Sequence, residues 1–118
     1  MGYLTREQIL GAQDRKVIEL EVPEWGGTLR LRSMSGAAAE EYVKAVAESK
    51  SDFEPLLLLI SSSVIDENGD LMFPSPEDVK GLANKNLLAL KNVSEACMGV
   101  NGFDQTEVVE SLKETASE

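Results

Sequence analysis

The chain has 118 residues, 42% of them hydrophobic and 27% charged, which fits one globular domain with a sizeable core. Acidic residues outnumber basic ones by 21 to 11, so the net charge is −10 and the chain lacks the basic surface that nucleic-acid binding requires. It has no histidine and a single cysteine, Cys97, which excludes an internal disulfide and a cysteine–histidine metal site.

The first residues of the chain do not have the basic start and apolar run of a signal peptide. The longest apolar run, Leu56–Ile60, is too short to span a bilayer. We therefore expect a protein that does not enter a membrane and that keeps Cys97 reduced in a cytoplasm. The sequence shows no nucleophile–base pair, so we expect no enzymatic activity, no cofactor and no metal.

A capping-box pattern opens the first predicted element. Thr5 and Gln8 stand three residues apart, the spacing at which each side chain bonds the backbone N–H of the other residue. The apolar residues Ile9 and Leu10 follow. This pattern predicts a short helix over Arg6–Ala12.

The stretch Lys16–Ser35 alternates with period two on both sides of a turn segment, Pro23–Gly27, and predicts a β-hairpin. One face of the two strands is apolar: Ile18, Leu20, Val22, Leu29 and Leu31. The other face is charged: Glu19, Glu21, Arg30 and Arg32. An isolated hairpin is marginal in water, so we expect the following helices to cover the apolar face.

Two strand registers are compatible with this hairpin. A two-residue turn at Gly26-Gly27 pairs Val22 with Leu31, whereas a longer loop pairs Val22 with Leu29. Both registers keep the apolar residues on one face, because a shift of two residues preserves the side. Both also place an acid opposite an arginine on the wet face: Glu21 with Arg32, or Glu21 with Arg30.

Trp25 is the only tryptophan, and it lies at the predicted tip of the hairpin. Its ring either folds back over the hairpin or serves as an anchor for a partner, since tryptophan is enriched at interface hot spots.

Two helices are predicted after the hairpin. Ser35 caps a helix over Gly36–Glu48, whose alanines and glutamates favour helix and whose apolar stripe contains Tyr42, Val43 and Val46. The segment Phe53–Val64 carries the five-residue apolar run on every side of one turn. We expect it to be the most buried helix.

An Asn-Gly pair at Asn68-Gly69 predicts a second, small hairpin over residues 64–73. A calcium loop is the competing interpretation, because acidic and amide residues stand at its first, third, fifth and twelfth places: Asp66, Asn68, Asp70 and Glu77. The sixth place of such a loop requires glycine, and here it is Leu71. This mismatch favours the hairpin.

Two more helices follow in the sequence. Ser75, with proline and acids after it, opens a short helix that ends near Gly81–Asn84. Helical spacing of apolar residues then predicts a helix over Asn86–Met98 that includes Leu87 and stops at Gly99. Cys97 lies on the apolar face of that helix, where we expect a small core residue.

The end of the chain is predicted to be distinct from the body. We expect a domain over residues 1–100, a hinge at Val100–Gly102 and an acidic C-terminal helix or tail over residues 101–118. The apolar residues of this last segment either pack on the domain or dock on a partner. The candidate partner-binding residues are therefore Trp25, Phe103, Val108, Val109 and Leu112.

These elements together predict an α+β fold. The N-terminal hairpin over about residues 16–34 packs against a mostly helical remainder of four to five helices, with the small second hairpin near residues 64–73.

Several segments are similar to one known family: LTREQILGA at Leu4–Ala12, ELEVPEWGGTLRLRSMSG at Glu19–Gly36, VIDENGDLMF at Val64–Phe73 and the PEDV helix start. Over about residues 4–100 the chain resembles the tail assembly chaperones of long-tailed, siphovirus-type bacteriophages and prophages.

The resemblance implies a non-enzymatic assembly factor that binds the tape-measure protein, with the tail tube protein and a second copy of the chain as further candidate partners. It also implies action in the host bacterial cytoplasm and absence from the mature virion. Two other functions remain open: a structural tail-completion or connector protein of the virion, and an acidic inhibitor that mimics DNA.

Overall fold

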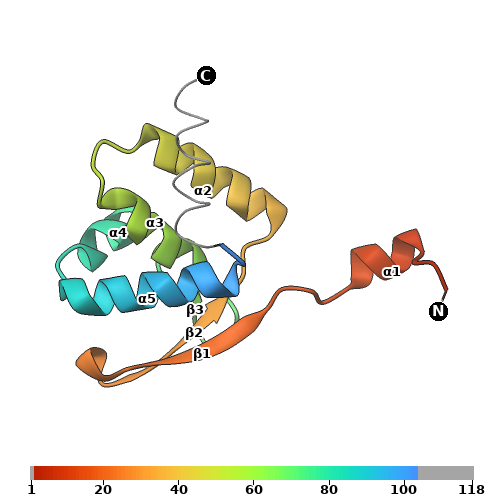
Figure 1. Ribbon diagram of the computed structural model, residues 1–118, viewed down its shortest axis with the longest axis horizontal. Helices are drawn as coiled ribbons and strands as arrows, with labels where there is room; N and C mark the ends of the chain where they lie inside the picture. The colour runs from red at the N-terminus through yellow and green to blue at the C-terminus, as the bar shows by residue number, and fades with distance from the viewer. Residues whose placement is uncertain (1, 104–118) are drawn as a thin grey trace.

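The computed structural model of the protein describes residues 2–103, and Met1 and residues 104–118 lie outside the described part. An antiparallel three-stranded sheet, in the order β1-β2-β3, carries helices α2 to α5 on one face (Figure 1). This arrangement confirms the predicted α+β class with an N-terminal hairpin and about five helices. The elements are α1 (Arg6–Gly11), β1 (Val17–Val22), a 3-10 turn (Pro23–Trp25), β2 (Gly27–Arg32), α2 (Gly36–Glu48), α3 (Glu54–Ser63), β3 (Val64–Ile65), α4 (Pro76–Leu82) and α5 (Leu87–Val100).

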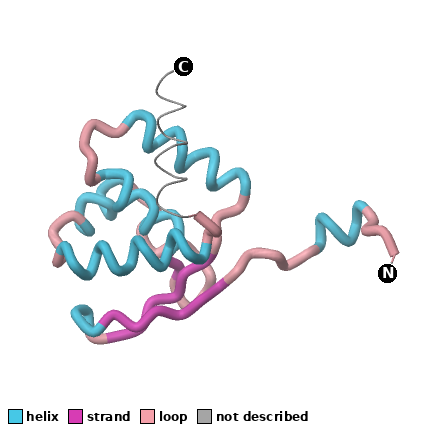
Figure 2. Tube along the Cα trace, in the orientation of Figure 1, coloured by secondary structure: helices cyan, strands magenta, loops and turns pink. Residues whose placement is uncertain are grey.

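The capping box that was predicted for α1 is present. The backbone N–H of Gln8 donates to Thr5 Oγ1 at 3.1 Å, and the backbone N–H of Thr5 donates to Gln8 Oε1 at 2.9 Å. The helix ends at Gly11, one residue before the predicted end. A loop separates α1 from the sheet, so the helix stands apart from the body of the molecule (Figure 2).

The hairpin has a register that differs from both predicted ones. Val22 pairs with Gly27, and Leu20 pairs with Leu29. Pro23 begins a 3-10 turn, and Gly26 closes it with a left-handed φ of 73° while its N–H donates to the Pro23 carbonyl at 3.1 Å. The loop is therefore four residues long, and the apolar residues still share one face because the shift is again two residues.

The same register corrects the predicted pairing of charges on the wet face. Glu19, rather than Glu21, lies opposite Arg30, and their side chains approach to 3.9 Å. Glu21 lies opposite Thr28. The Arg30 side chain is 42% exposed and the Glu19 side chain 68% exposed, so solvent screens this long ion pair and it contributes little to stability.

The small second hairpin is confirmed, and its first strand also joins the sheet. Asp66 N–H donates to the Asp70 carbonyl at 2.8 Å, and an isolated bridge joins Ile65 to Leu71. Asp66 Oδ1 accepts the backbone N–H groups of Asn68 and Asp70, which orders the turn. On its other edge β3 pairs with β2, a contact that the sequence pattern did not predict.

The core lies between the sheet and the helices. Five of the ten residues of α3 are buried, against six of the fourteen in α5, so α3 is the more buried helix by fraction. The fully buried side chains come from both helices and both neighbouring strands: Leu31, Leu59, Ile60, Ser63, Val64, Leu90, Val93 and Cys97. Two residues predicted for apolar stripes are instead exposed, Val43 by 38% and Leu87 by 56%.

The end of α5 also differs from the prediction. The helix runs through Gly99 to Val100, and Gly102, with φ 74°, is the left-handed residue that ends it. Within the segment expected to be a hinge, the side chain of Asn101 bonds α5, the end of α3 and the loop between β2 and α2. Its Oδ1 accepts the N–H of Met34 at 2.6 Å, and its Nδ2 donates to Ser63 Oγ at 3.1 Å and to the Cys97 carbonyl at 2.8 Å.

Candidate functional site

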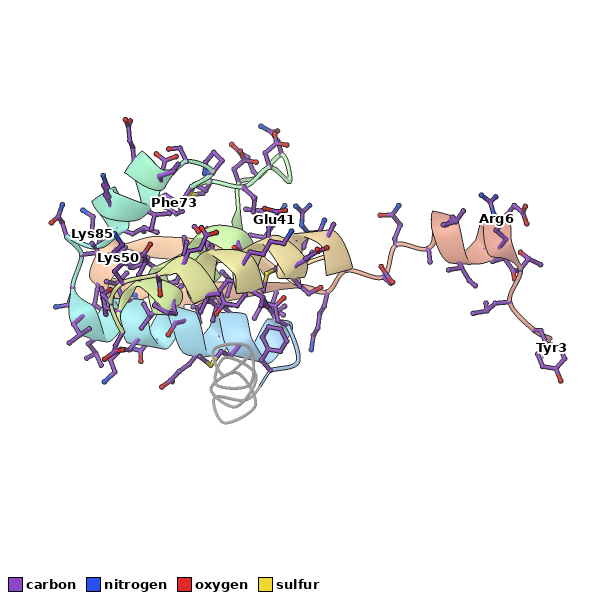
Figure 3. All side chains as sticks on the ribbon, turned by 90° about the horizontal axis from the view of Figure 1, so that it is seen from above. Tyr3, Arg6, Glu41, Lys50, Phe73 and Lys85 are labelled. Carbon is purple, nitrogen blue, oxygen red and sulfur yellow. The ribbon has the colours of Figure 1, made fainter. Side chains whose placement is uncertain are left out.

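The N-terminal arm, defined here as residues 2–14, has no buried residue. Figure 3 shows Tyr3 and Arg6 far from the rest of the protein. Large apolar side chains on the arm are open to solvent: Tyr3, Leu4, Ile9 and Leu10. Ile9 is 58% exposed and Leu10 69% exposed, although both belong to a well-capped helix. Such a concentration of apolar surface is typical of a protein–protein contact site.

The arm is attached to the sheet by a short network at its base. Lys16 N–H donates to Ser33 Oγ at 2.9 Å, and Ser33 N–H donates to the Lys16 carbonyl at 2.8 Å. Arg15 Nε also donates to the Ser33 carbonyl at 3.0 Å. These bonds hold the point at which the arm leaves the sheet.

The candidate partner-binding residues from the sequence do not form one site. Trp25 lies in the 3-10 turn and is half-buried, with its side chain packed against the hydrophobic core. Phe103 is half-buried, and its N–H donates to the Met98 carbonyl at 2.9 Å. The other three candidates lie outside the described residues: Val108, Val109 and Leu112.

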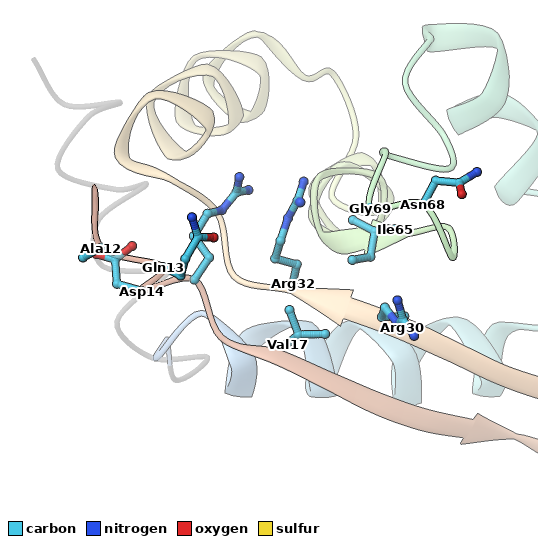
Figure 4. Close-up of a pocket in the computed structure, with 10 residues that line it drawn as sticks. Ala12, Gln13, Asp14, Val17, Arg30, Arg32, Ile65, Asn68 and Gly69 are labelled. Carbon is cyan, nitrogen blue, oxygen red and sulfur yellow. The ribbon is translucent and has the colours of Figure 1, made fainter. Parts of the chain in front are cut away.

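Beside the base of the arm is a hollow of about 420 Å³, which we call the arginine hollow. Arg15, Arg30 and Arg32 line it, together with one acid, Asp14. Figure 4 shows Arg32 between the turn at Gly69 and the linker that carries Asp14. The arginines come from the linker and from β2, whose alternation places Arg30 and Arg32 on the face opposite the helices.

The charges in the arginine hollow influence one another. Partial desolvation lowers the pKa of Arg15, the positive charge of Arg32 lowers it further, and Asp14 acts in the opposite direction. The two guanidinium groups are therefore close enough to repel each other.

A second hollow of about 260 Å³ lies on the other side of Arg30 and has the opposite character. Its acidic lining residues are Glu19, Asp66 and Glu67. Within residues 2–103 no group of three or more acidic or cysteine side chains is arranged to hold a metal ion. Asp66 instead uses its carboxylate to cap the turn, so the geometry favours the hairpin over the calcium loop.

Cys97 is fully buried, and burial raises the pKa of its thiol to about 12, although a hydrogen bond with Ser63 lowers it in part. The thiolate is the reactive form of cysteine, so this side chain acts as a core residue. Burial also raises the pKa of Tyr42, and the nearby Cys97 adds to this effect. In the described part of the chain, no helix has both the length and the apolar character needed to cross a membrane.

Sequence reasoning did not identify the two most distinctive surfaces. The helical pattern at Ile9 and Leu10 was visible, but only the structure shows that nothing in the described chain covers them. The alternation placed Arg30 and Arg32 on the outer face, yet no local signal connects them with Arg15, which is distant in sequence.

The fold has a known counterpart. No protein-family model and no curated protein matches the chain. Among solved structures it is similar to the tail assembly chaperone of bacteriophage HK97, with a TM-score of 0.58 and 18% sequence identity. The match covers 80% of this chain and 90% of that chain. The chain therefore has a fold like that of a phage tail assembly chaperone.

Proposed function

We propose that the protein is a non-enzymatic phage tail assembly chaperone that binds the tape-measure protein during tail morphogenesis. The observation that carries this proposal is the fold shared with the HK97 chaperone over most of both chains. The segment resemblance from the sequence points to the same family, independently of the three-dimensional comparison. The same proposal includes action in the host bacterial cytoplasm, absence from the mature virion, and neither cofactor nor membrane.

The exposed arm supports a role in holding another polypeptide. A long helical client exposes an apolar stripe before assembly and is prone to aggregate. The arm presents apolar side chains on a loop-tethered helix, and the net charge of −10 keeps the rest of the molecule soluble. We therefore assign client contact first to Ile9 and Leu10, ahead of the half-buried Trp25.

Release is as important as binding for an assembly factor. Burying one leucine side chain contributes roughly 1.5–3 kcal/mol, and part of this is lost to the ordering of the arm. Each contact is then weak, and repeated contacts along a long client provide retention without permanent attachment. Tail tube subunits that polymerise on the client can displace such contacts one at a time. Recruitment of the tube protein and self-association belong to the same proposal.

Co-expression with a tape-measure protein encoded in the same phage or prophage tests the proposal. We expect the soluble fraction of the client to rise several-fold with the wild-type chain and to fall back with the double variant Ile9→Ser/Leu10→Ser. The matched control is Leu87→Ser/Leu88→Ser, since this second leucine-bearing pair is exposed by 56% and 61% on the body. An unchanged client solubility with the wild-type chain would contradict the chaperone role. An equal loss with both double variants would contradict the assignment to the arm.

Mass spectrometry of purified virions distinguishes the chaperone from a structural tail-completion or connector protein. The chaperone is expected to be absent, whereas a structural subunit is present in fixed stoichiometry. An acidic DNA mimic would instead compete with DNA for an enzyme, so an electrophoretic competition assay addresses that alternative.

A further inference from the structure

The arginine hollow has a charge opposite to that of the molecule. The chain contains 11 basic and 21 acidic residues, yet this one hollow gathers three arginines and a single acid. The reversal is local, because the neighbouring hollow on the other side of Arg30 is lined by three acids. A positive hollow within a negative surface attracts single anionic groups at short range and repels extended polyanions at long range.

Arg32 is the central side chain of the hollow, and one of its donors is unsatisfied. Its Nε is buried and has no hydrogen-bond partner among the described residues. A buried donor without a partner is costly, and natural folds seldom leave one without a reason. The guanidinium lies beside the second hairpin: a Cβ added at Gly69 would stand 3.9 Å from Arg32 Nη1. This is an ordinary van der Waals distance, so Gly69 lies next to Arg32, and its φ of 88° accounts for the glycine at this turn.

Arg15 is held in place next to this group. Its Nε is already engaged with the Ser33 carbonyl at 3.0 Å, which orients the terminal nitrogens while leaving them available as donors. Desolvation is the main cause of the lowered pKa of Arg15, the positive charge of Arg32 lowers it further, and Asp14 acts in the opposite direction. An oxyanion between them would remove the repulsion and accept hydrogen bonds from both side chains.

We propose that the arginine hollow binds a side-chain carboxylate of an acidic polypeptide segment, with Arg32 and Arg15 as the donors. Guanidinium groups recognise carboxylates and phosphates through paired N–H donors, so both chemistries fit the donors themselves. The surroundings favour the carboxylate: a hollow of about 420 Å³ accommodates a side chain, and the adjacent acidic hollow repels a continuous phosphate backbone. The proposal does not depend on the role in tail assembly.

The test is a titration of the full-length chain with a hexaglutamate peptide at low salt, observed through the side-chain Nε–H signals of arginine in NMR spectra. We expect saturable shifts at Arg32 and Arg15, and no comparable shift at Arg6, which lies on the arm away from the hollow. Binding should weaken as salt is added, because the contact is between charged groups.

Variants distinguish recognition of a carboxylate by Arg32 and Arg15 from attraction by the positive charge alone. Arg32→Gln and Arg15→Gln should each weaken hexaglutamate binding by about tenfold or more, the loss expected for one charge-assisted hydrogen-bonding group. Arg6→Gln removes the same charge elsewhere and should leave affinity unchanged. Arg32→Lys keeps the charge but removes the planar donor set, so it should also lose most of the affinity. Because Arg15 is exposed, its variant remains informative if Arg32→Gln fails to fold.

Three results would overturn the proposal. The first is an equal loss of affinity in Arg6→Gln, which would show that binding follows net charge alone. The second is full affinity in Arg32→Lys. The third is inorganic phosphate binding as tightly as hexaglutamate at the same sites, which would identify the hollow as a phosphate site instead.

Discussion

Asn101 offers the sharpest test of how the parts of this fold are held together. One side chain at the end of α5 reaches the loop after β2 and the end of α3, because it accepts from Met34 N–H and donates to Ser63 Oγ and the Cys97 carbonyl. Replacement by alanine removes all three bonds and leaves no donor or acceptor of the right reach in their place. The substitution Asn101→Ala should therefore loosen the sheet from the helices at this end.

The expected loss of stability follows from the hydrogen-bonding groups that lose Asn101 as their partner. A typical hydrogen bond contributes about 0.5–1.5 kcal/mol net, and a part-buried donor such as the N–H of Met34 costs about 1–3 kcal/mol when it is left unpaired. Together these terms give a loss of about 3 kcal/mol in the free energy of unfolding. At about 4 °C per kcal/mol for a domain of this size, the Tm should fall by roughly 12 °C.

Urea denaturation and amide hydrogen exchange measure this effect at two levels. Denaturation of Asn101→Ala gives the global loss, and the control Asn84→Ala, at an exposed asparagine, should change stability by less than about 0.5 kcal/mol. Exchange at the amide of Met34 should become at least about tenfold faster in Asn101→Ala. A loss no larger than that of the control, with unchanged exchange at Met34, would refute the reasoning.

Three further predictions follow from local features. Gly26→Ala should lower stability by about 1 kcal/mol in thermal denaturation, because Gly26 has φ 73°, whereas Gly27→Ala should have a smaller effect in the adjoining strand. The thiol of Cys97 keeps its proton in the folded chain up to about pH 12, while an ordinary thiol loses it near 9.0. The stabilisation that the protonated thiol provides is therefore complete below pH 9 and falls as the pH rises towards 12. This fall should be absent from the pH profile of Cys97→Ala. Alkylation of Cys97 at pH 8 should require unfolding of the native chain. Deletion of residues 2–12 should change the Tm by no more than about 2 °C by calorimetry, because every residue removed is exposed, while client solubilisation is lost.

Local chemistry was sufficient to predict most of the elements. The capping box of Thr5, the alternation of the hairpin and the proline-and-acid start of α4 each depend on residues a few positions apart. Such patterns act through neighbouring backbone groups, so the sequence contains all the information that they need. The α+β class followed from these elements alone.

Relations between distant segments required the tertiary structure. The sequence allowed two registers for the hairpin and the structure shows a third, because a 3-10 turn that starts at Pro23 places a four-residue loop at residues 23–26, nearer the first strand than either prediction. Pairing of β3 with β2 depends on segments more than thirty residues apart, for which no local signal exists. Hydrophobic periodicity states which residues prefer burial, but it does not state which partners they meet.

For the functional surfaces, too, the sequence determined the local features and the tertiary structure determined the rest. The sequence by itself determined the negative charge, the hairpin faces and the apolar character of the first helix. Only the tertiary structure decided that Ile9 and Leu10 are exposed, that Arg15 and Arg32 line one hollow with Gly69, and that Asn101 is a tether. The physical reason is that exposure and charge proximity depend on contacts across the whole fold, whereas propensity and capping depend on adjacent residues alone.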